Sequence, residues 1–474
     1  MIGGWPGEAM SGMPRTRYRN AAVAILASAI AAAPFAAGSR VFSQSAAAAS
    51  HGDSGEVTFP LRTRTSQRYL EDAAGKPFLM HGDTAWSLIA QLTREDAEKY
   101  LEDRRQRGFN TILVNLLEHR FATKAPANIY GQPPFTVAGD FSTPNEAYFA
   151  HADQVLRMAA EKGFLVLLAP AYLGYDGGPE GWYKTMVANG LATLRVYGQY
   201  LGRRYRNLNN IMWAHAGDYN PPNKDLVRAV ADGIRDFDTI SLHTVHCAPE
   251  TAAIEYWKGD PWLHVNNVYT YKPVYAPALR QHAQAARMPF FLLESAYENE
   301  HGATELRVRI QAYQALLAGA AGQVYGNNPI WHFDGPGLHP VPASWQESLN
   351  SRGAQSMAHL RALFAELPWW TLEPDTAGTF LVAGAGGGME RAVAAVAQDK
   401  SMAILYLPTL RKVRVDLGRL VGPKITARWY DPSSGTFATV NGSPFPKAAS
   451  HILQPDTLNS AGLGDWILLL ESGS

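Results

Sequence analysis

Two acidic residues give the strongest chemical signal in the sequence. Glu294 follows directly on the apolar run 289–293, and Asp218 lies in a similar strand-like segment, 210–220. A carboxylate that emerges from a buried strand costs free energy unless it is paired or used. If both face one cleft, they can cleave a glycosidic bond with retention, one as nucleophile and the other as general acid/base. The alternatives are a structural salt bridge for Glu294 and a helix cap or turn residue for Asp218.

Seven further residues stand at or just beyond the ends of other predicted strands. We expect them to line the same cleft and to bind substrate: Asp83, Trp86, Asn115, His119, His243, Tyr269 and Trp331. The indole rings of Trp86 and Trp331 are expected to offer stacking faces to sugar rings. The alternative is that the chain's 12 Trp, 21 Tyr and 18 Phe residues simply fill a large core.

Eight short apolar segments are typical of β-strands and must position these residues. They begin near residues 78, 111, 164, 210, 239, 264, 289 and 323, and helical periodicity separates most of them. Eight β/α units over residues 78–367 predict an α/β fold, a (β/α)₈ TIM barrel, whose chemistry lies at the C-terminal ends of its strands. The alternative, a doubly wound open sheet, would favour a glycine-rich phosphate loop after the first strand, and the turn at 81–86 has none.

The texture of the sequence predicts three parts. Residues 1–50 resemble a secretory leader, because Arg15, Arg17 and Arg19 precede an apolar run and then a cluster of small residues. Residues 51–368 form the predicted barrel, and residues 369–474 a small all-β sandwich domain, because short strand-like runs alternate there with Gly, Pro, Asp and Ser. The leader predicts export to the periplasm or the outside of a bacterial cell; a retained N-terminal anchor is the alternative.

Composition excludes several classes of function. The chain has one cysteine, so disulfides within it and Cys₄ or Cys₂His₂ zinc sites are excluded. Its 42 basic and 42 acidic residues balance to zero formal charge, unlike the basic stripe of a nucleic-acid-binding protein. We expect a carbohydrate substrate, no cofactor, no metal, no nucleic acid and, after removal of the leader, no membrane. We make no prediction for the oligomeric state.

Two other functions compete with glycoside hydrolysis. A metal-dependent hydrolase on the same barrel could draw its ligands from His215, Asp218, His243 and His246, but the His-x-His pair usual on the first strand is missing. Chelation would separate this alternative from the first. A non-catalytic carbohydrate-binding protein is expected to have lost one catalytic carboxylate, and both are present here.

Four segments together resemble the apiosidase-like glycoside hydrolases, that is, glycoside hydrolase family 140 and its relatives, formerly domain of unknown function 4038. The segments are 82–86, 108–111, 213–220 and 293–295. The block 465–471 is similar to a β domain that is often fused to them and is labelled as collagen-binding. The resemblance extends over nearly all of residues 57–472.

The resemblance implies a retaining mechanism in a barrel, with Asp218 as acid/base, Glu294 as nucleophile and an activity of the β-apiofuranosidase type. By the same analogy Tyr269 should donate a hydrogen bond to the nucleophile. The wider clan usually has Asn-Glu where this chain has Gly217-Asp218, so the shorter acid must lie nearer to the leaving group. A β-sandwich beside a barrel more often braces it or extends the sugar site than binds collagen.

Overall fold

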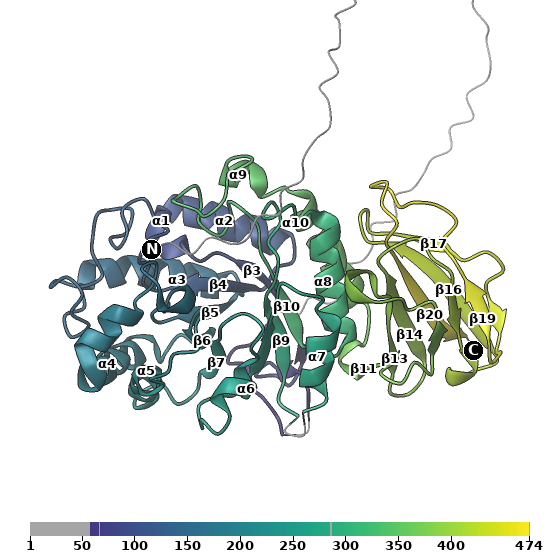
Figure 1. Cartoon of the computed structure of the whole chain (residues 1–474), viewed down its shortest axis with the longest axis horizontal. Helices are drawn as coiled ribbons and strands as arrows, with labels where there is room; N and C mark the ends of the chain where they lie inside the picture. The colour runs from purple at the N-terminus through teal and green to yellow at the C-terminus, as the bar shows by residue number, and fades with distance from the viewer. Residues whose placement is uncertain (1–56, 66, 285–286, 474) are drawn as a thin grey trace, which may run out of the picture. The chain divides into compact units, whose positions relative to one another are not determined.

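The computed structural model describes residues 57–473 except 66, 285 and 286, and the predicted leader lies outside the described residues. A barrel of eight parallel strands forms the first part (Figure 1). The strands are β3 (Met80–Thr84), β4 (Thr111–Asn115), β5 (Leu165–Ala169), β6 (Ile211–Ala216), β7 (Leu242–His246), β8 (Asn266–Tyr269), β9 (Phe290–Glu294) and β10 (Gly322–Tyr325). The (β/α)₈ prediction is therefore confirmed.

The order of the strands is β7-β6-β5-β4-β3-β10-β9-β8, so the first strand of the barrel pairs with the last. Between β7 and β8, side chains supply part of the closure. The Thr244 hydroxyl donates to the carbonyl of Val265 over 2.8 Å, and the Asn267 side-chain amide donates to the carbonyl of Val245 over 2.7 Å. Thr244 and Asn267 thus have a structural part, because their side chains bond across the gap between β7 and β8.

Helices follow the strands around the sheet (Figure 1). They are α1 (Leu88–Gln91), α2 (Arg94–Gln106), α3 (Glu146–Glu161), α4 (Tyr183–Tyr205), α5 (Asp225–Arg235), α6 (Ala253–Trp257), α7 (Tyr275–His282), α8 (Glu305–Leu317), α9 (Trp345–Ser348) and α10 (Arg352–Ala365). Their starts are set locally: the Thr93 hydroxyl accepts from the backbone N–H of Asp96 at 3.2 Å, and Asn145 and Ser351 cap α3 and α10 similarly. Among the described residues, no helix is long and apolar enough to cross a membrane.

Alternate residues of each barrel strand face opposite sides. One apolar cluster takes Leu113, Leu167 and Met212 from neighbouring strands, and it fills the interior of the barrel. The residues beside them in sequence, such as Val166 and Trp213, belong to a second cluster that includes the helices. This alternation decides which polar residues at the strand ends can reach the mouth of the barrel.

The C-terminal part holds two antiparallel sheets, as the sequence predicts. The larger runs β11 (Leu372–Pro374), β13 (Val393–Ala397), β14 (Met402–Leu407), β20 (Trp466–Gly473), β16 (Lys424–Asp431) and β17 (Thr436–Thr439), with β18 (Phe445–Pro446) also on β16. The smaller joins β12 (Leu381–Ala383), β15 (Val413–Val415) and β19 (His451–Leu453). A short hairpin, β1 (Leu70–Glu71) with β2 (Pro77–Phe78), precedes the barrel.

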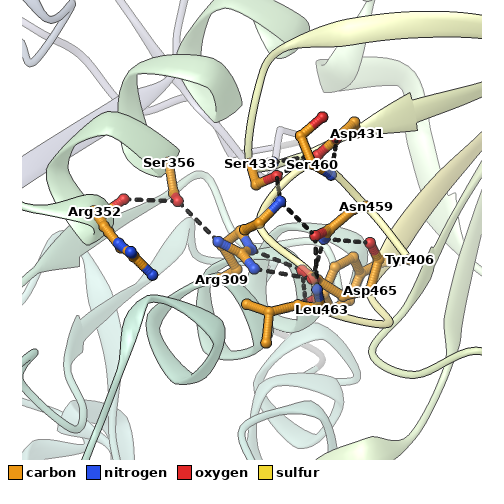
Figure 2. Close-up of polar contacts among 11 residues, drawn as sticks. Arg309, Arg352, Ser356, Tyr406, Asp431, Ser433, Asn459, Ser460, Leu463 and Asp465 are labelled. Atoms are coloured by element: carbon orange, nitrogen blue, oxygen red, sulfur yellow. Dashed lines mark hydrogen bonds and ion pairs between the residues drawn. The ribbon is translucent and has the colours of Figure 1, made fainter. Parts of the chain in front are cut away.

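A buried ion pair joins the barrel to this β domain (Figure 2). Arg309, on α8, donates from Nε and Nη2 to the two carboxylate oxygens of Asp465, over 2.7 and 2.9 Å, and both side chains are fully buried. The Tyr406 hydroxyl and the Asn459 amide also donate to Asp465, and Ser356 accepts from Arg309. Each of the two buried charges thus has the other as its ion-pair partner and accepts or donates further hydrogen bonds.

Candidate active site

A pocket of about 320 Å³ lies at the C-terminal ends of the barrel strands and contains both predicted carboxylates. Four of the seven predicted substrate-binding residues also line it, namely Trp86, Asn115, Tyr269 and Trp331. The remaining wall consists of Arg120, Phe121, Tyr172, Tyr175, Glu180, Tyr271, Tyr297, Glu300 and Leu338. A cavity of similar size near Tyr69 and Trp369 contains neither carboxylate, so the chemistry belongs to the first pocket.

Asp218 is presented on a strained turn directly after β6. Ala216, Gly217 and Asp218 all have positive φ angles, of 62°, 132° and 52°. Such angles cost a non-glycine residue about 1–3 kcal/mol and are typical of functional sites. A side chain at Gly217 would meet the ring of Tyr172 at 2.3 Å, and the Tyr172 hydroxyl donates to Asp218 Oδ2 over 2.6 Å. The turn thus holds the carboxylate against this tyrosine.

A β-bulge turns Glu294 into the pocket. Along the β8–β9 pairing, Val268 lies opposite Leu292 but Tyr269 lies opposite Glu294, so Leu293 is the extra residue. Because Leu293 belongs to the interior cluster, strict alternation would aim Glu294 at the helices. The bulge removes that alternation and brings the carboxylate to the barrel mouth.

Both carboxylate oxygens of Glu294 accept hydrogen bonds. Oε2 lies 2.7 Å from Nε2 of His246, and Oε1 accepts from the Tyr271 hydroxyl over 3.2 Å. Burial and the negative charge of Asp218 raise the pKa of Glu294, and the bonds from His246 and Tyr271 partly offset this rise. Burial and the neighbouring acid thus outweigh the two donors.

His246 connects the two carboxylate residues. The backbone N–H of Asp218 donates to its Nδ1 over 2.9 Å, which assigns the ring proton to Nε2 and so makes Nε2 the donor to Glu294. Burial lowers the pKa of His246, but Glu294 and Asp218 more than compensate, and the pKa is raised. A proton on Nδ1 would nevertheless break the bond from Asp218, so this geometry is that of the neutral ring.

The two carboxylates lie close together. One oxygen of Asp218, one oxygen of Glu294 and one ring nitrogen of His246 all fall within 4.8 Å of one another. Retaining glycosidases separate their carboxyl groups by about 5–5.5 Å, whereas inverting ones use about 6.5–9.5 Å. Within the described residues, Asp218 Oδ1 has no hydrogen-bond partner, whereas Oδ2 accepts from Tyr172.

Three predicted substrate-binding residues do not line the pocket. Asp83 is fully buried on the helix side of β3, where the Tyr100 hydroxyl donates to it over 2.8 Å and Arg104 lies at 3.4 Å; burial raises its pKa to about 6. His243 also faces the helices, 2.8 Å from His215. His119 stands edge-on to Trp182, with ring centroids 4.7 Å apart. Strand alternation explains the first two, and a turn after β4 the third.

The predicted bond from Tyr269 to the nucleophile is also wrong. Tyr269 lines the pocket, but its hydroxyl meets that of Tyr271 at 3.0 Å, and it is Tyr271 that reaches Glu294. His246, a candidate metal ligand from the sequence, instead contacts both carboxylate residues, and Glu300 is a pocket residue for which the sequence predicts no role. Counting inward positions along β7 from Thr244 would have selected His246 in place of His243.

Comparisons with known proteins match two family models to the chain. A family model described as "Apiosidase-like, catalytic domain" matches residues 64–371, and one described as "Putative collagen-binding domain of a collagenase" matches residues 377–471. A solved structure named "Glycoside hydrolase" is 26% identical, with 87% of this chain and 97% of that chain covered and a TM-score of 0.76. A search of curated proteins gives no match.

A second solved structure, a glycoside hydrolase family 5 protein from Bacteroides vulgatus, has the same fold. It is 24% identical, covers 87% of this chain and 93% of its own, and has a TM-score of 0.76. Both structures span the barrel and the β domain together, since the coverage in each exceeds the length of either part.

Proposed function

Since the chain belongs to the apiosidase-like glycoside hydrolases, we propose that it is an exported retaining enzyme that cleaves glycosidic bonds in side chains of plant or microbial polysaccharides or in glycosides, with an activity of the β-apiofuranosidase type. The observation that carries the retaining assignment is the close approach of Asp218 and Glu294, with oxygens within 4.8 Å, in one pocket.

In the first step Asp218 gives its proton to the glycosidic oxygen while Glu294 attacks the anomeric carbon. The bond to the leaving group breaks, and an ester forms between the sugar and Glu294. In the second step Asp218, now ionised, takes a proton from water as that water attacks the same carbon, and Glu294 leaves. The anomeric configuration is retained because it is inverted twice.

The hydrogen bonds support this division of roles. Glu294 is met by donors at both oxygens, from His246 and Tyr271, which suits a group that must be ionised to attack. Asp218 receives a side-chain donor at Oδ2 only, from Tyr172, and its Oδ1 has no partner among the described residues. The general acid and the nucleophile thus differ in the number of donors that meet them.

The size of the pocket supports action near the end of a chain. At about 320 Å³ it lies at the low end of small-molecule pockets, which range over about 300–1,000 Å³. Trp86, Tyr172 and Trp331 wall it with aromatic rings. A terminal sugar fits this shape better than the interior of a long polysaccharide.

The activity is tested by a screen of the purified protein against plant-polysaccharide oligosaccharides and aryl glycosides, with Glu294→Gln as the inactive control. NMR of the first product then gives its anomeric configuration. Retention is the expected result. An inverted first product would refute the double-displacement mechanism. Equal turnover by Glu294→Gln would refute the assignment of Asp218 and Glu294 as the catalytic pair.

Export is proposed from the basic cluster and apolar run of the first 50 residues. The test is expression of the full chain in a bacterial host, followed by fractionation and mass spectrometry of the N-terminus. A periplasmic or secreted protein that begins between residues 38 and 50 is expected. A protein that keeps the apolar run and stays with the membrane would support an anchor instead.

One observation favours a second candidate, a metal-dependent hydrolase, because Asp218, His246 and Glu294 have a spacing that can hold a cation. Both ring nitrogens of His246 are already used, however, Nδ1 by the Asp218 N–H and Nε2 by Glu294. A cation would have to displace one of these bonds. Full activity after exhaustive chelation is expected, and loss that is restored by added divalent ions would favour the metal enzyme.

A further inference from the structure

Glu300 is a further carboxylate at the pocket, and neither step of the proposed mechanism uses it. It stands in the loop between β9 and α8, and its side chain is 15% exposed. Oε1 accepts a hydrogen bond from the indole N–H of Trp331 over 2.8 Å. Nε2 of His339 is 3.8 Å from Oε2, beyond hydrogen-bond distance, and no described residue donates to Oε2. The Oε2 atom of this pocket-lining carboxylate therefore keeps accepting capacity.

The loop fixes this side chain in place. Asn299 and His301, on either side of Glu300, have positive φ angles of 70° and 47°. The Ala303 N–H donates to the Glu300 carbonyl over 2.8 Å, and the Asn299 N–H donates to the Ala303 carbonyl over 2.9 Å. Left-handed residues on both sides of one acid cost free energy and persist where the surroundings hold them. The acid is thus held in a defined direction before any ligand arrives.

The charges around the pocket limit what Glu300 can bind. The lining holds four acids, Glu180, Asp218, Glu294 and Glu300, but only one base, Arg120. A sugar with a carboxylate or phosphate group would be repelled at the reacting position. An ionised carboxylate accepts hydrogen bonds only, and the donors that a neutral sugar offers are its hydroxyl groups.

We propose that Glu300 binds hydroxyl groups of a neutral sugar at the reacting subsite and that it thereby sets the sugar specificity of the pocket. Oε2 accepts from the sugar, and Oε1 keeps Trp331 oriented as the adjoining wall. The proposal rests on the proposed function, because it assumes that the sugar beside Asp218 and Glu294 is the one that is cleaved. It adds the class of that sugar: neutral, with unsubstituted hydroxyls toward the β9–α8 loop.

The pH dependence of binding offers a signature of this role. Burial raises the pKa of Glu300 to about 7, the charge of Glu294 adds to the rise, and the Trp331 bond opposes it. The titratable groups that face Glu300 are Glu294, His301 and His339. Charge-assisted bonds are stronger than neutral ones, so sugar affinity should be full above pH 7 and fall as Glu300 gains its proton.

The test is equilibrium binding, which does not depend on turnover. Neutral methyl glycosides and the matching methyl uronides are titrated into the wild type, Glu300→Gln and Glu300→Ala, and the fluorescence of the pocket tryptophans is followed. We expect the wild type to bind a neutral glycoside and no uronide. A hydrogen bond to a charged group is worth about 10- to 100-fold in affinity, so Glu300→Ala should bind that much more weakly. Glu300→Gln should also lose the pH dependence near 7.

Glu305→Gln is the matched control. Glu305 begins α8, its carboxylate pairs with Arg352 at 3.3 Å, and it does not line the pocket. It should bind as the wild type does. Unchanged affinity in Glu300→Ala, tighter binding of a uronide, or no binding of any neutral glycoside by the wild type would each overturn the proposal. Hydrolysis is measured separately, so a protein that binds through Glu300 without cleaving refutes only the proposed function.

Discussion

At the scale of single residues, the site separates two carboxylates by their hydrogen bonds. Glu294 is met by donors on both oxygens, and Asp218 by one side-chain donor. His246 contacts both residues at once, through the Asp218 backbone and the Glu294 side chain. A single neutral imidazole therefore links the proposed nucleophile to the proposed acid, and changes at His246 should affect both steps of the proposed mechanism.

The roles of the pair predict different losses. Glu294→Ala should be inactive on every substrate, since no glycosyl ester can form. Asp218→Ala should lose activity on natural glycosides. It should keep a measurable first step on aryl glycosides with acidic phenols, because these phenols leave without protonation. Added azide should speed turnover of Asp218→Ala and give a glycosyl azide of retained configuration, seen by NMR. If azide rescued Glu294→Ala and not Asp218→Ala, the two roles would be the reverse of those proposed.

Tyr271 predicts a shift in the pH profile. Glu294 must be ionised to attack, and its pKa is raised above the ordinary value of 4.5, so kcat/KM should fall as the pH drops through that raised pKa. Tyr271→Phe removes a donor to Glu294, which should raise the pKa further and move the acidic limb to higher pH. Its loss in kcat/KM should be about 10-fold, the value of one hydrogen bond to a charge.

Tyr269→Phe is the control, because its hydroxyl meets Tyr271 rather than Glu294. Its acidic limb should move less than that of Tyr271→Phe. An equal or larger shift in the control would return the role to Tyr269, where the sequence reasoning had put it.

The sequence could identify the two carboxylates because each comes at the end of a segment with strand character, 210–218 and 289–294. It could not separate inward from outward residues elsewhere. Asp83 and His243 lie within β3 and β7, and they point at α2 and at His215. Their facing follows from the alternation along β3 and β7, and strands that are buried on both faces do not show in their sequence which residues face inward.

At the scale of elements, the turn after β6 carries the conformational cost of the site. Gly217→Ala places a side chain 2.3 Å from the ring of Tyr172 at a φ of 132°. The ring or the turn must then move, and the bond from Tyr172 to Asp218 with it. We expect stability to fall by about 1–3 kcal/mol in urea unfolding and kcat/KM to fall at least about 10-fold, as one charged hydrogen bond is lost.

Gly163→Ala is a matched control, since Gly163 also has a positive φ, 78°, but no atom within 4 Å of an added side chain. It should cost about 1 kcal/mol of backbone strain and leave kcat/KM unchanged. If both variants lose activity equally, the turn has no special part in holding Asp218.

The eight strands and most helices were predictable because apolar periodicity reports burial directly. Two features of the elements were not. The extra residue at Leu293 depends on pairing with β8, a partner distant in sequence, and the seam between β7 and β8 depends on Thr244 and Asn267 finding backbone carbonyls. Both are properties of contacts between strands, which a single strand's composition does not reveal.

At the scale of the whole molecule, barrel and β domain share one core. Leu316 and Tyr313 of α8 belong to the same buried cluster as Ile404, Ile467 and Leu469 of the β domain. The rings of Tyr313 and Tyr406 stack with centroids 4.8 Å apart. A helix that follows the nucleophile strand is thus covered by the second domain. This contact supports a bracing role for that domain.

The buried pair between Arg309 and Asp465 makes the bracing measurable. Removing one partner leaves the other charge buried and uncompensated, which typically costs about 3–5 kcal/mol. Asp465→Ala should therefore lower the free energy of unfolding by about that amount in urea, although it lies in the β domain. The loss should appear as one transition that circular dichroism and enzyme activity report together, because the shared core couples the barrel to the β domain.

Two comparisons make the result specific to the interface. Asp225→Ala removes one of the two carboxylate partners of Arg228, in a largely exposed pair with side chains 61% and 40% exposed, and should cost less than about 1 kcal/mol. Replacing Arg309 and Asp465 together by Met and Leu removes both buried charges, so it should cost less than Asp465→Ala alone. If Asp465→Ala unfolded in two transitions and lost activity only in the second, the barrel would be shown to stay folded without the β domain. A single early transition would show that the stability of the turn after β6, of β9 and of α8 depends on the β domain. That domain contributes no residue to the pocket lining.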